Sequence, residues 1–277
     1  MTQPDRRHFL TWASTTGAFF AAHGCSGAED PMRDTVGKGE PLIRHLELLS
    51  AAPLADMKAF YHTSLGLRIA EEKADRLTVE AGRTLLTFLE PATGDGKPFY
   101  HFAFNIPENK AAAARDWQAK RTPLLPIPKA LRDPDYPDDV VHYRHWNAHS
   151  VFFFDPAGNV VEYIARHDLK NRAPGEFGTA DILYASEIAF VVDDVPAATA
   201  WLKEGVRLAE YNGTSNQFAA LGDAHGLLLV MKRGRLISFD AKEKKEVGVF
   251  PTVATVRGTR RSRSALPRFP YAVAVEG

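Results

Sequence analysis

From residue 43 onward the sequence repeats one unit, a strand followed by a helix and then by three strands. In the first copy the opening strand is 43–49, and the helix follows in 53–61 with apolar residues at helical spacing. Gly66 is a usual residue for ending such a helix. The three further strands are predicted at 67–72, 76–81 and 83–90.

Two more copies follow. The second unit spans 100–166, with a helix at 109–120 and a Pro- and Asp-rich insertion at 121–148. The third unit spans 183–235, with a helix after Asp193-Asp194 and strands at 207–211, 217–221 and 227–232. The predicted fold class is therefore α+β, with repeated βαβββ modules. We expect the first two to pair into a cup and the third to be left without a partner.

The clearest turn in the chain is Asp155-Pro156-Ala157-Gly158, which lies between two apolar runs and predicts a β-hairpin. Glu162 lies within the second apolar run. An unpaired carboxylate in an apolar strand is costly. We therefore expect Glu162 either to face water or to meet a cation.

Histidines begin two of the predicted opening strands. His45 and Glu47 share one face of their strand, and His101 shares a face with Ala103 and Asn105, because side chains alternate along a strand. The opposite, apolar faces are expected to pack on the helices. The histidine faces then line a polar concavity, which suits a small-molecule ligand.

The unit, the strand with His45, the Phe60-Tyr61…Leu65-Gly66 helix end and the Asp155-Pro156…Gly158…Glu162 hairpin together resemble the vicinal oxygen chelate superfamily. That superfamily includes glyoxalase I, bleomycin-resistance proteins and extradiol ring-cleaving dioxygenases. The resemblance covers about residues 43–234 and implies modules paired around a divalent metal ion. The ligands come from the first and last strands of the modules.

Carried onto this sequence, the resemblance implies a metal site of His45, His101 and Glu162. The further glutamate of glyoxalase-like members falls near Thr87, which is not a carboxylate. Two histidines and one glutamate match the facial triad of non-haem Fe²⁺ oxygenases. Fe²⁺ is therefore the favoured metal, with Mn²⁺, Zn²⁺ or Ni²⁺ as alternatives. The predicted acid/base candidates are His142, His145 and His149, because imidazole titrates near neutral pH.

Together these features predict a metal-dependent enzyme acting on a small molecule, similar to an extradiol dioxygenase. A glyoxalase-like lyase or isomerase and a non-catalytic binding protein remain alternatives. Glu187 takes the place in the third unit that His45 and His101 hold in the others. We therefore expect the third unit to serve as a scaffold. Its unpaired sheet has two possible partners, the segment 247–256 folded back as an added strand or the third unit of a second chain, and we favour the homodimer.

The segment 1–25 resembles a twin-arginine export signal, with Arg6-Arg7 before a mildly apolar run. Cys25 is the only cysteine, so no intramolecular disulfide forms, and its context loosely resembles a lipoprotein processing site. Lipidation of Cys25 would be the one attachment to a membrane. The segment 26–40 is expected to be a linker, and the protein is expected in the periplasm or cell envelope.

Composition and charge bear on which partners the protein binds. The chain has 34 Lys and Arg residues and 34 Asp and Glu residues, so its net charge gives no indication of nucleic-acid binding. No apolar stretch of about 20 residues follows the N-terminal segment. At the C-terminal end, 247–257 predicts an extra strand. The basic segment 258–277 is expected to be a disordered tail.

Overall fold

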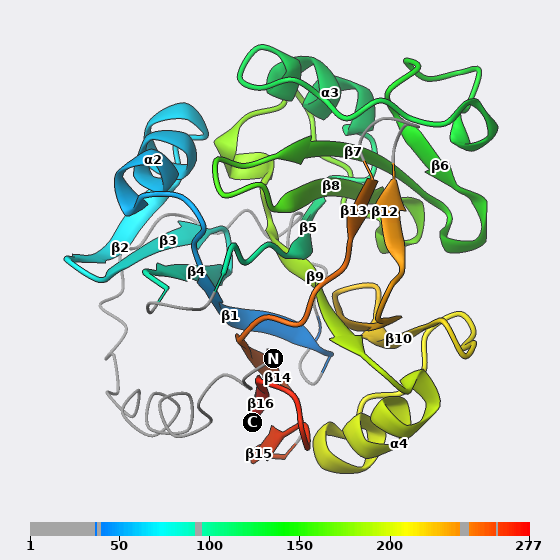
Figure 1. The fold of residues 1–277 in the computed structure, drawn as a ribbon. Helices are drawn as coiled ribbons and strands as arrows, with labels where there is room; N and C mark the ends of the chain where they lie inside the picture. Colours follow the sequence, from blue (N-terminus) through cyan, green and yellow to red (C-terminus); the bar gives the residue numbers. More distant parts are fainter. Residues whose placement is uncertain (1–36, 38–39, 92–95, 239–243, 259) are drawn as a thin grey trace.

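The computed structural model describes residues 37, 40–91, 96–238, 244–258 and 260–277. The predicted signal segment, Cys25 and most of the predicted linker lie outside this range. Two seven-stranded sheets and a few helices make up the described chain, so the α+β class is confirmed (Figure 1). No helix within the described residues is long and apolar enough to cross a membrane.

The first unit forms as predicted. Its elements are β1 (Leu42–Leu49), α2 (Leu54–Lys58), a π-helical turn (Ala59–Ser64), β2 (Arg68–Lys73), β3 (Arg76–Ala81) and β4 (Thr84–Leu89). Gly66 ends the helical segment with a φ of 77°, a left-handed conformation that favours glycine. Met57 and Tyr61 are fully buried and pack with Leu46 and Leu48, on the apolar face of β1.

The second and third units follow the same plan. The second contains β5 (His101–Ile106), α3 (Ala111–Ala119), β6 (Val141–Tyr143), β7 (Ala148–Phe154) and β8 (Val160–Arg166). The third contains β9 (Tyr184–Val192), α4 (Val195–Val206), β10 (Phe218–Asp223) and β11 (Gly226–Lys232). The side chain of Asp194 caps α4 by accepting a hydrogen bond from the Ala197 N–H. The strand predicted at 207–211 is reduced to one bridge between Glu210 and Leu221.

The C-terminal region corrects one expectation and confirms another. The predicted extra strand exists as β14 (Thr252–Arg257), after a short hairpin of β12 (Leu236–Ser238) and β13 (Lys244–Glu246). The expected disordered tail instead forms β15 (Ser262–Ala265) and β16 (Tyr271–Glu276). The physical reason is an apolar residue at every second position, since Tyr271, Val273 and Val275 are all buried. The preceding basic run hid this short pattern.

The order of strands shows which units pair. One sheet has the order β15-β16-β14-β1-β4-β3-β2, and the other has the order β10-β11-β9-β5-β8-β7-β6. The expected pairing of the first unit with the second is therefore wrong. The second unit pairs with the third, through antiparallel β5 and β9, and the first pairs with the C-terminal strands, through antiparallel β1 and β14.

The C-terminal strands act as a shortened fourth unit. Strand β14 lies parallel to β16, just as β1 lies parallel to β4. The third unit consequently finds its partner within the chain, and its sheet does not need a second chain to cover it. The homodimer stays a prediction for which the sheet order supplies no reason.

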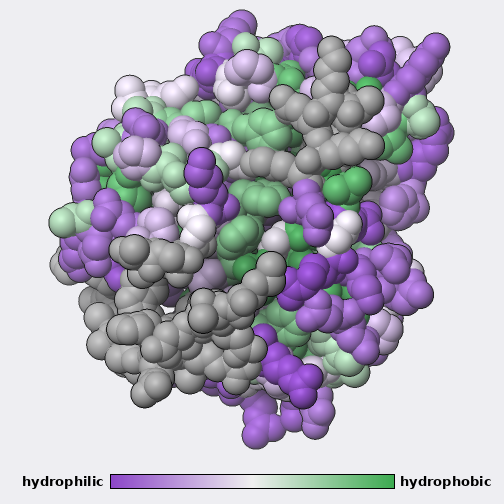
Figure 2. All heavy atoms as spheres, in the orientation of Figure 1, coloured by the Kyte–Doolittle hydropathy of each residue, from purple (hydrophilic) through white to green (hydrophobic). Residues whose placement is uncertain are grey.

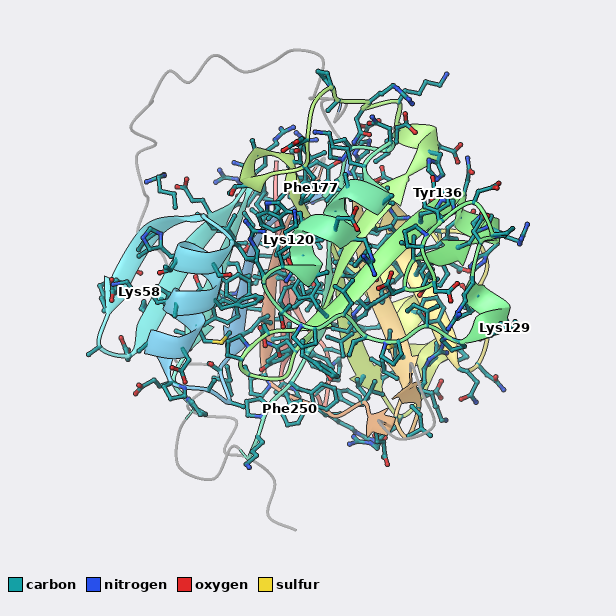
Figure 3. The ribbon with its side chains drawn as sticks, turned by 90° about the horizontal axis from the view of Figure 1, so that it is seen from above. Lys58, Lys120, Lys129, Tyr136, Phe177 and Phe250 are labelled. Atoms are coloured by element: carbon teal, nitrogen blue, oxygen red, sulfur yellow. The ribbon has the colours of Figure 1, made fainter. Side chains whose placement is uncertain are left out.

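Helices cover the apolar faces of both sheets, and one large hydrophobic core includes residues from all four units. On the second unit, Trp117 of α3 packs against Phe177 and Tyr163, with ring centroids 5.4 and 6.5 Å apart. Figure 3 shows Phe177 close to this helix. On the face drawn in Figure 2, hydrophobic residues gather near the middle and hydrophilic residues lie mostly around the rim.

A buried tyrosine ties the two sheets together. The Tyr271 hydroxyl of β16 accepts a hydrogen bond from the Val191 N–H at 3.0 Å and donates one to the Val191 carbonyl at 2.9 Å. Val191 lies in β9, beyond the last residue that β5 pairs. Its backbone groups would otherwise be buried without partners, which is costly. The tyrosine thus replaces a missing strand at this point.

We predict that Tyr271→Phe lowers the free energy of unfolding by about 1–3 kcal/mol, because it leaves both groups of Val191 unsatisfied. Urea denaturation measures this change. Tyr136→Phe is the matched control, because the Tyr136 hydroxyl makes no hydrogen bond to any described residue. Equal stability of the two variants would contradict the role given to Tyr271.

Candidate metal centre

His101 is held in the form that binds a metal ion. Its Nδ1 lies 3.0 Å from the Val160 carbonyl, to which it donates a hydrogen bond. The lone pair is therefore on Nε2, which points away from that carbonyl. Burial lowers the pKa of His101 to about 4, so the ring is neutral at pH 7.

Two glutamates from neighbouring strands lie beside Nε2. Ala103 of β5 is paired with Glu162 of β8 on one side and with Glu187 of β9 on the other. The small side chain of Ala103 leaves space between the two carboxylates. The Nε2 atom of His101 lies 3.5 Å from Glu162 Oε2 and 4.0 Å from Glu187 Oε2. Three donor atoms thus lie within 4.8 Å of one another, in a buried site.

The charge of this cluster is not balanced. Arg166 forms an ion pair with Glu187, and no lysine or arginine among the described residues forms one with Glu162, so two carboxylates share one guanidinium. Glu162 Oε1 and Arg166 Nη1 are buried and make no hydrogen bond to the described residues. Burial, and then the Glu187 carboxylate, raise the pKa of Glu162 well above its ordinary value. The site therefore holds a proton or takes up another cation.

The donor set fits a divalent metal ion. One neutral imidazole and two carboxylates are ligands that suit Mn²⁺, Fe²⁺ and Zn²⁺. An unsatisfied carboxylate oxygen at the same point supports this use. The site has three candidate protein ligands, because the fourth equivalent position is apolar. In the second unit, His101 pairs with Val160 of β8, and Glu162 lies two residues after Val160. In the third unit, Glu187 pairs with Leu227 of β11, and the residue two positions after Leu227 is the buried Leu229.

The first unit lacks such a centre. His45 pairs with Leu85, and two residues further on β4 carries Thr87, at the position that corresponds to Glu162. The Nε2 atom of His45 lies 2.8 Å from the Thr87 hydroxyl, which lies 2.8 Å from the Thr78 hydroxyl. The position that corresponds to Glu187 is Val253. His45 is thus a partly buried histidine whose ring nitrogen is satisfied by a hydroxyl.

The structure therefore assembles part of the predicted site. It brings His101 and Glu162 together, and it leaves His45 in the other sheet because the first and second units do not pair. The third member of the cluster is Glu187, which sequence reasoning placed in a scaffold. Its signal was present, since Glu187 occupies the position of the opening-strand histidine.

Aromatic side chains surround the centre. Tyr143 and Trp146 pack over Ala103, Ala148 and Ile164. The Arg166 guanidinium carbon lies 5.2 Å from the Trp146 ring centroid. Burial and the carboxylates of Glu162 and Glu187 raise the pKa of Tyr143 well above its ordinary value, so its hydroxyl keeps its proton at neutral pH. Tyr143 is a titratable residue near this pair of carboxylates that sequence reasoning did not select.

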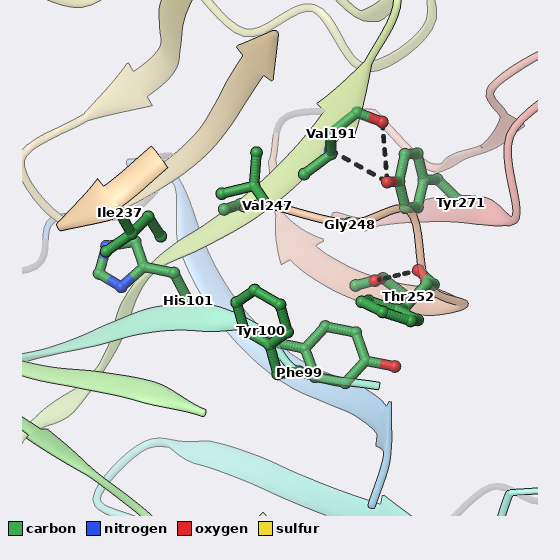
Figure 4. A pocket seen from close by; sticks show the side chains of 11 residues that line it. Phe99, Tyr100, His101, Val191, Ile237, Val247, Gly248, Thr252 and Tyr271 are labelled. Atoms are coloured by element: carbon green, nitrogen blue, oxygen red, sulfur yellow. Dashed lines mark hydrogen bonds between the residues drawn. The ribbon is translucent and has the colours of Figure 1, made fainter. Parts of the chain in front are cut away.

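A pocket adjoins the His101 side chain. It lies between β5 and β9 and the chain from β12 to β16, and Ile237 lines it beside the His101 ring (Figure 4). The remaining lining residues are mostly apolar, namely Phe99, Tyr100, Ala189, Val191, Val247, Gly248, Phe250, Thr252 and Tyr271. A ligand at the centre would therefore meet an apolar wall on this side.

The three predicted acid/base histidines do not lie with the carboxylates. Phe152 is paired with Glu162, and His149, three residues earlier on β7, faces the opposite side of the sheet. His142 is paired directly with His149 and shares that side. His145 is exposed in the turn after β6, with its ring 6.3 Å from that of Tyr143. The alternation of side chains along β6 and β7 sets which side of the sheet His142 and His149 face. The sequence of the insertion shows no alternating pattern from which this could be predicted.

No protein-family model matches the chain, and no curated protein matches it by sequence. Among solved structures, it is similar to a "putative dioxygenase" from Bacillus subtilis, with 16% identity, a TM-score of 0.52 and 86% of each chain covered. It also matches glyoxalase I from Zea mays, with 11% identity, a TM-score of 0.46, and 85% of this chain and 92% of that one covered.

A shorter match is a glyoxalase/bleomycin resistance protein/dioxygenase from Alicyclobacillus acidocaldarius, with 18% identity and a TM-score of 0.33. It covers 44% of this chain and 89% of that chain. At these identities the likeness establishes the fold alone. The chain shares the fold of the Bacillus subtilis protein, and this is consistent with the fold that the sequence resemblance predicted.

The buried His45 predicts a measurable pH dependence. Burial lowers the pKa of His45 from 6.5 to about 4. The unfolded chain therefore takes up a proton near pH 6.5 that the folded chain excludes until about pH 4. Stability from this residue is present above pH 6.5 and is lost as the pH falls through that window, by on the order of 3 kcal/mol.

Replacing His45 with Gln, which keeps a hydrogen-bonding group but does not titrate, should reduce the acid sensitivity by this amount. Denaturant unfolding at about pH 7.5, 6, 5 and 4 measures the free energy of unfolding of both proteins. The exposed His62 provides the control variant His62→Gln. If wild type and His45→Gln lost stability in parallel, the neutral buried state of His45 would be contradicted.

Proposed function

We propose that the protein is a metal-dependent enzyme that acts on a small molecule, with its centre at His101, Glu162 and Glu187. The observation that carries this proposal is the pair of buried carboxylates beside the Nε2 lone pair of His101, with too little positive charge to balance them. The similarity of the fold to enzymes of the vicinal oxygen chelate type supports it.

Within this class, a dioxygenase-type reaction is the one that we favour. Three protein ligands leave further positions of a metal ion open for a substrate and a second reactant. The apolar Leu229 at the fourth ligand position supports a three-ligand centre over the four-ligand glyoxalase type. The metal, when bound, would supply Lewis-acid and redox chemistry.

The residues around the centre would bind and orient the substrate. The Arg166 Nη1 atom, which makes no hydrogen bond in the described structure, would donate to an anionic or carbonyl oxygen. Tyr143, which keeps its proton at neutral pH, would donate a second hydrogen bond. Trp146 and Tyr143 would cover the substrate and exclude water from the centre.

A metal-free binding protein is the second candidate. The ion pair between Arg166 and Glu187 favours it, because it already neutralises one carboxylate. In that case a proton on Glu162 would balance the remaining charge, and Arg166 would bind an anionic ligand. Metal analysis of the purified protein separates the two candidates.

The two equivalent histidines provide a sharp test of the metal centre. We predict that His101→Ala weakens metal binding at the centre by more than about 100-fold, whereas His45→Ala leaves it unchanged. Calorimetric titration with Mn²⁺ measures both. Equal affinities in these two variants would contradict the proposed ligands.

The same titration has a predicted pH dependence. Because Glu162 holds a proton when no metal is bound, metal binding should release about one proton, and affinity should rise with pH. Titrations in buffers of different ionisation enthalpy measure the number of protons. Glu162→Gln should weaken binding and abolish the release, whereas a proton count unchanged in that variant would assign the release to another group.

We also propose that the protein is exported through its N-terminal twin-arginine segment. Replacing Arg6 and Arg7 with Lys should leave precursor protein in the cytoplasm, because this pathway reads the arginine pair. Cell fractionation and immunoblotting measure the distribution. Asp5→Asn is the neighbouring control. Undiminished export of the lysine variant would exclude this route.

A further inference from the structure

A second cluster of metal-ligating side chains lies on the opposite face of the same sheet. Asp133 follows a 3₁₀ turn in the insertion, and His142 and His149 are paired residues of β6 and β7. Asp133 Oδ2 lies 2.9 Å from His142 Nδ1 and 3.2 Å from His149 Nε2. All three ligating atoms lie within 4.8 Å of one another.

A count of protons shows that this cluster is short of one cation. His149 Nδ1 lies 2.7 Å from His167 Nε2, and His167 Nδ1 lies 3.2 Å from Glu108 Oε2. The series Asp133–His149–His167–Glu108 has three links, and each link needs one proton. Two neutral imidazoles bring only two N–H protons. In either direction of donation, one link has two lone pairs that face each other.

The charge distribution places the missing cation at the Asp133 end. Glu108 has Arg172 as an ion-pair partner, 3.0 Å away. Asp133 has no Lys or Arg partner within the described residues, and only histidines approach its Oδ2 atom. His142 Nδ1 is buried and makes no hydrogen bond in the described structure, although it lies beside that oxygen.

We propose that Asp133, His142 and His149 bind a divalent transition-metal ion, of the Zn²⁺ type, separate from the centre at His101. Two imidazoles and a carboxylate are a usual Zn²⁺ set, and bonds of about 2.0–2.2 Å place donors roughly 3.3 Å apart. The observed separations of 2.9 and 3.2 Å are close to this value. His167, held by Glu108, orients His149 as such second partners commonly do.

Binding requires one adjustment and has one structural consequence. The rings of His142 and His149 are stacked, with centroids 4.4 Å apart and 15° between their planes. The half-buried His142 ring must turn so that its Nδ1 lone pair points to the ion. The ion then links the irregular chain around Asp133 to β6 and β7. Because β6 also contains Tyr143, this link would stabilise the strand that holds Tyr143 near Glu162 and Glu187.

The experiment isolates this site by removing the first one. The double variant His101→Ala, Glu162→Gln, stripped of metal with a chelator, is titrated with Zn²⁺ by calorimetry. We expect one equivalent in this variant, two in the wild-type protein, and none in the double variant after His149→Ala. His145→Ala, an exposed histidine of the same insertion, is the matched control and should keep the equivalent.

The outcomes separate this proposal from the first. If the centre at His101 binds no metal, wild type should bind one equivalent that His149→Ala removes. Absence of Zn²⁺ binding by the double variant, or binding that survives both His142→Ala and His149→Ala, would overturn the second site.

Two further measurements guard against misfolding and assign His167. Addition of Zn²⁺ should raise the melting temperature of the double variant, and that rise should disappear in the conservative variant His142→Asn with its circular dichroism unchanged. His167→Gln should weaken Zn²⁺ binding by about 10–100-fold without removing the site. A melting temperature that does not respond to Zn²⁺ in the double variant would also count against the site.

Discussion

The structure depends on the burial of two carboxylates on either side of one alanine. Glu162 and Glu187 flank Ala103 on adjacent strands, and both are almost completely buried. Such burial is costly without compensating charge, and Arg166 supplies one positive charge for two negative ones. The sheet that holds them must therefore place a cation, or a proton, at the side of His101. This constraint is the reason why we place the proposed functional site beside His101 in the second sheet.

The two sheets have the same strand arrangement but carry different residues at corresponding positions. Corresponding positions carry His101, Glu162 and Glu187 in one sheet, and His45, Thr87 and Val253 in the other. The histidine is common to both, and its partner decides its role. A hydroxyl satisfies His45, whereas the carboxylates beside His101 make it a candidate metal ligand. In the function that we propose, one copy of the duplicated unit carries the chemistry and the other supplies a core.

Each sheet face of the second unit carries its own polar cluster. One face has the His101 centre, and the opposite face, here called the outer face, has Asp133, His142 and His149. Only the thickness of the sheet lies between them. Side chains that alternate along β7 and β8 keep the clusters apart. Tyr143, next to His142 in sequence, faces the side of the His101 centre, so β6 contributes a residue to each face.

The sequence by itself determined the repeated unit, its strand and helix positions, and the fold class. These depend on local periodicity and on turn residues such as Gly66 and the Asp155–Gly158 turn, which act within a few residues. It also identified His101 and Glu162 and the special position of Glu187.

Only the tertiary structure decided which units pair. Pairing is set by packing between segments far apart in the sequence, such as β1 with β14 and β5 with β9, and no local pattern encodes it. Because β5 pairs with β9, Glu187 lies in the centre beside His101, whereas His45 lies in the other sheet. The pairing of units also turned the short alternating pattern at Tyr271, Val273 and Val275 into a strand, because a two-residue period gains stability only when a partner strand buries its apolar face.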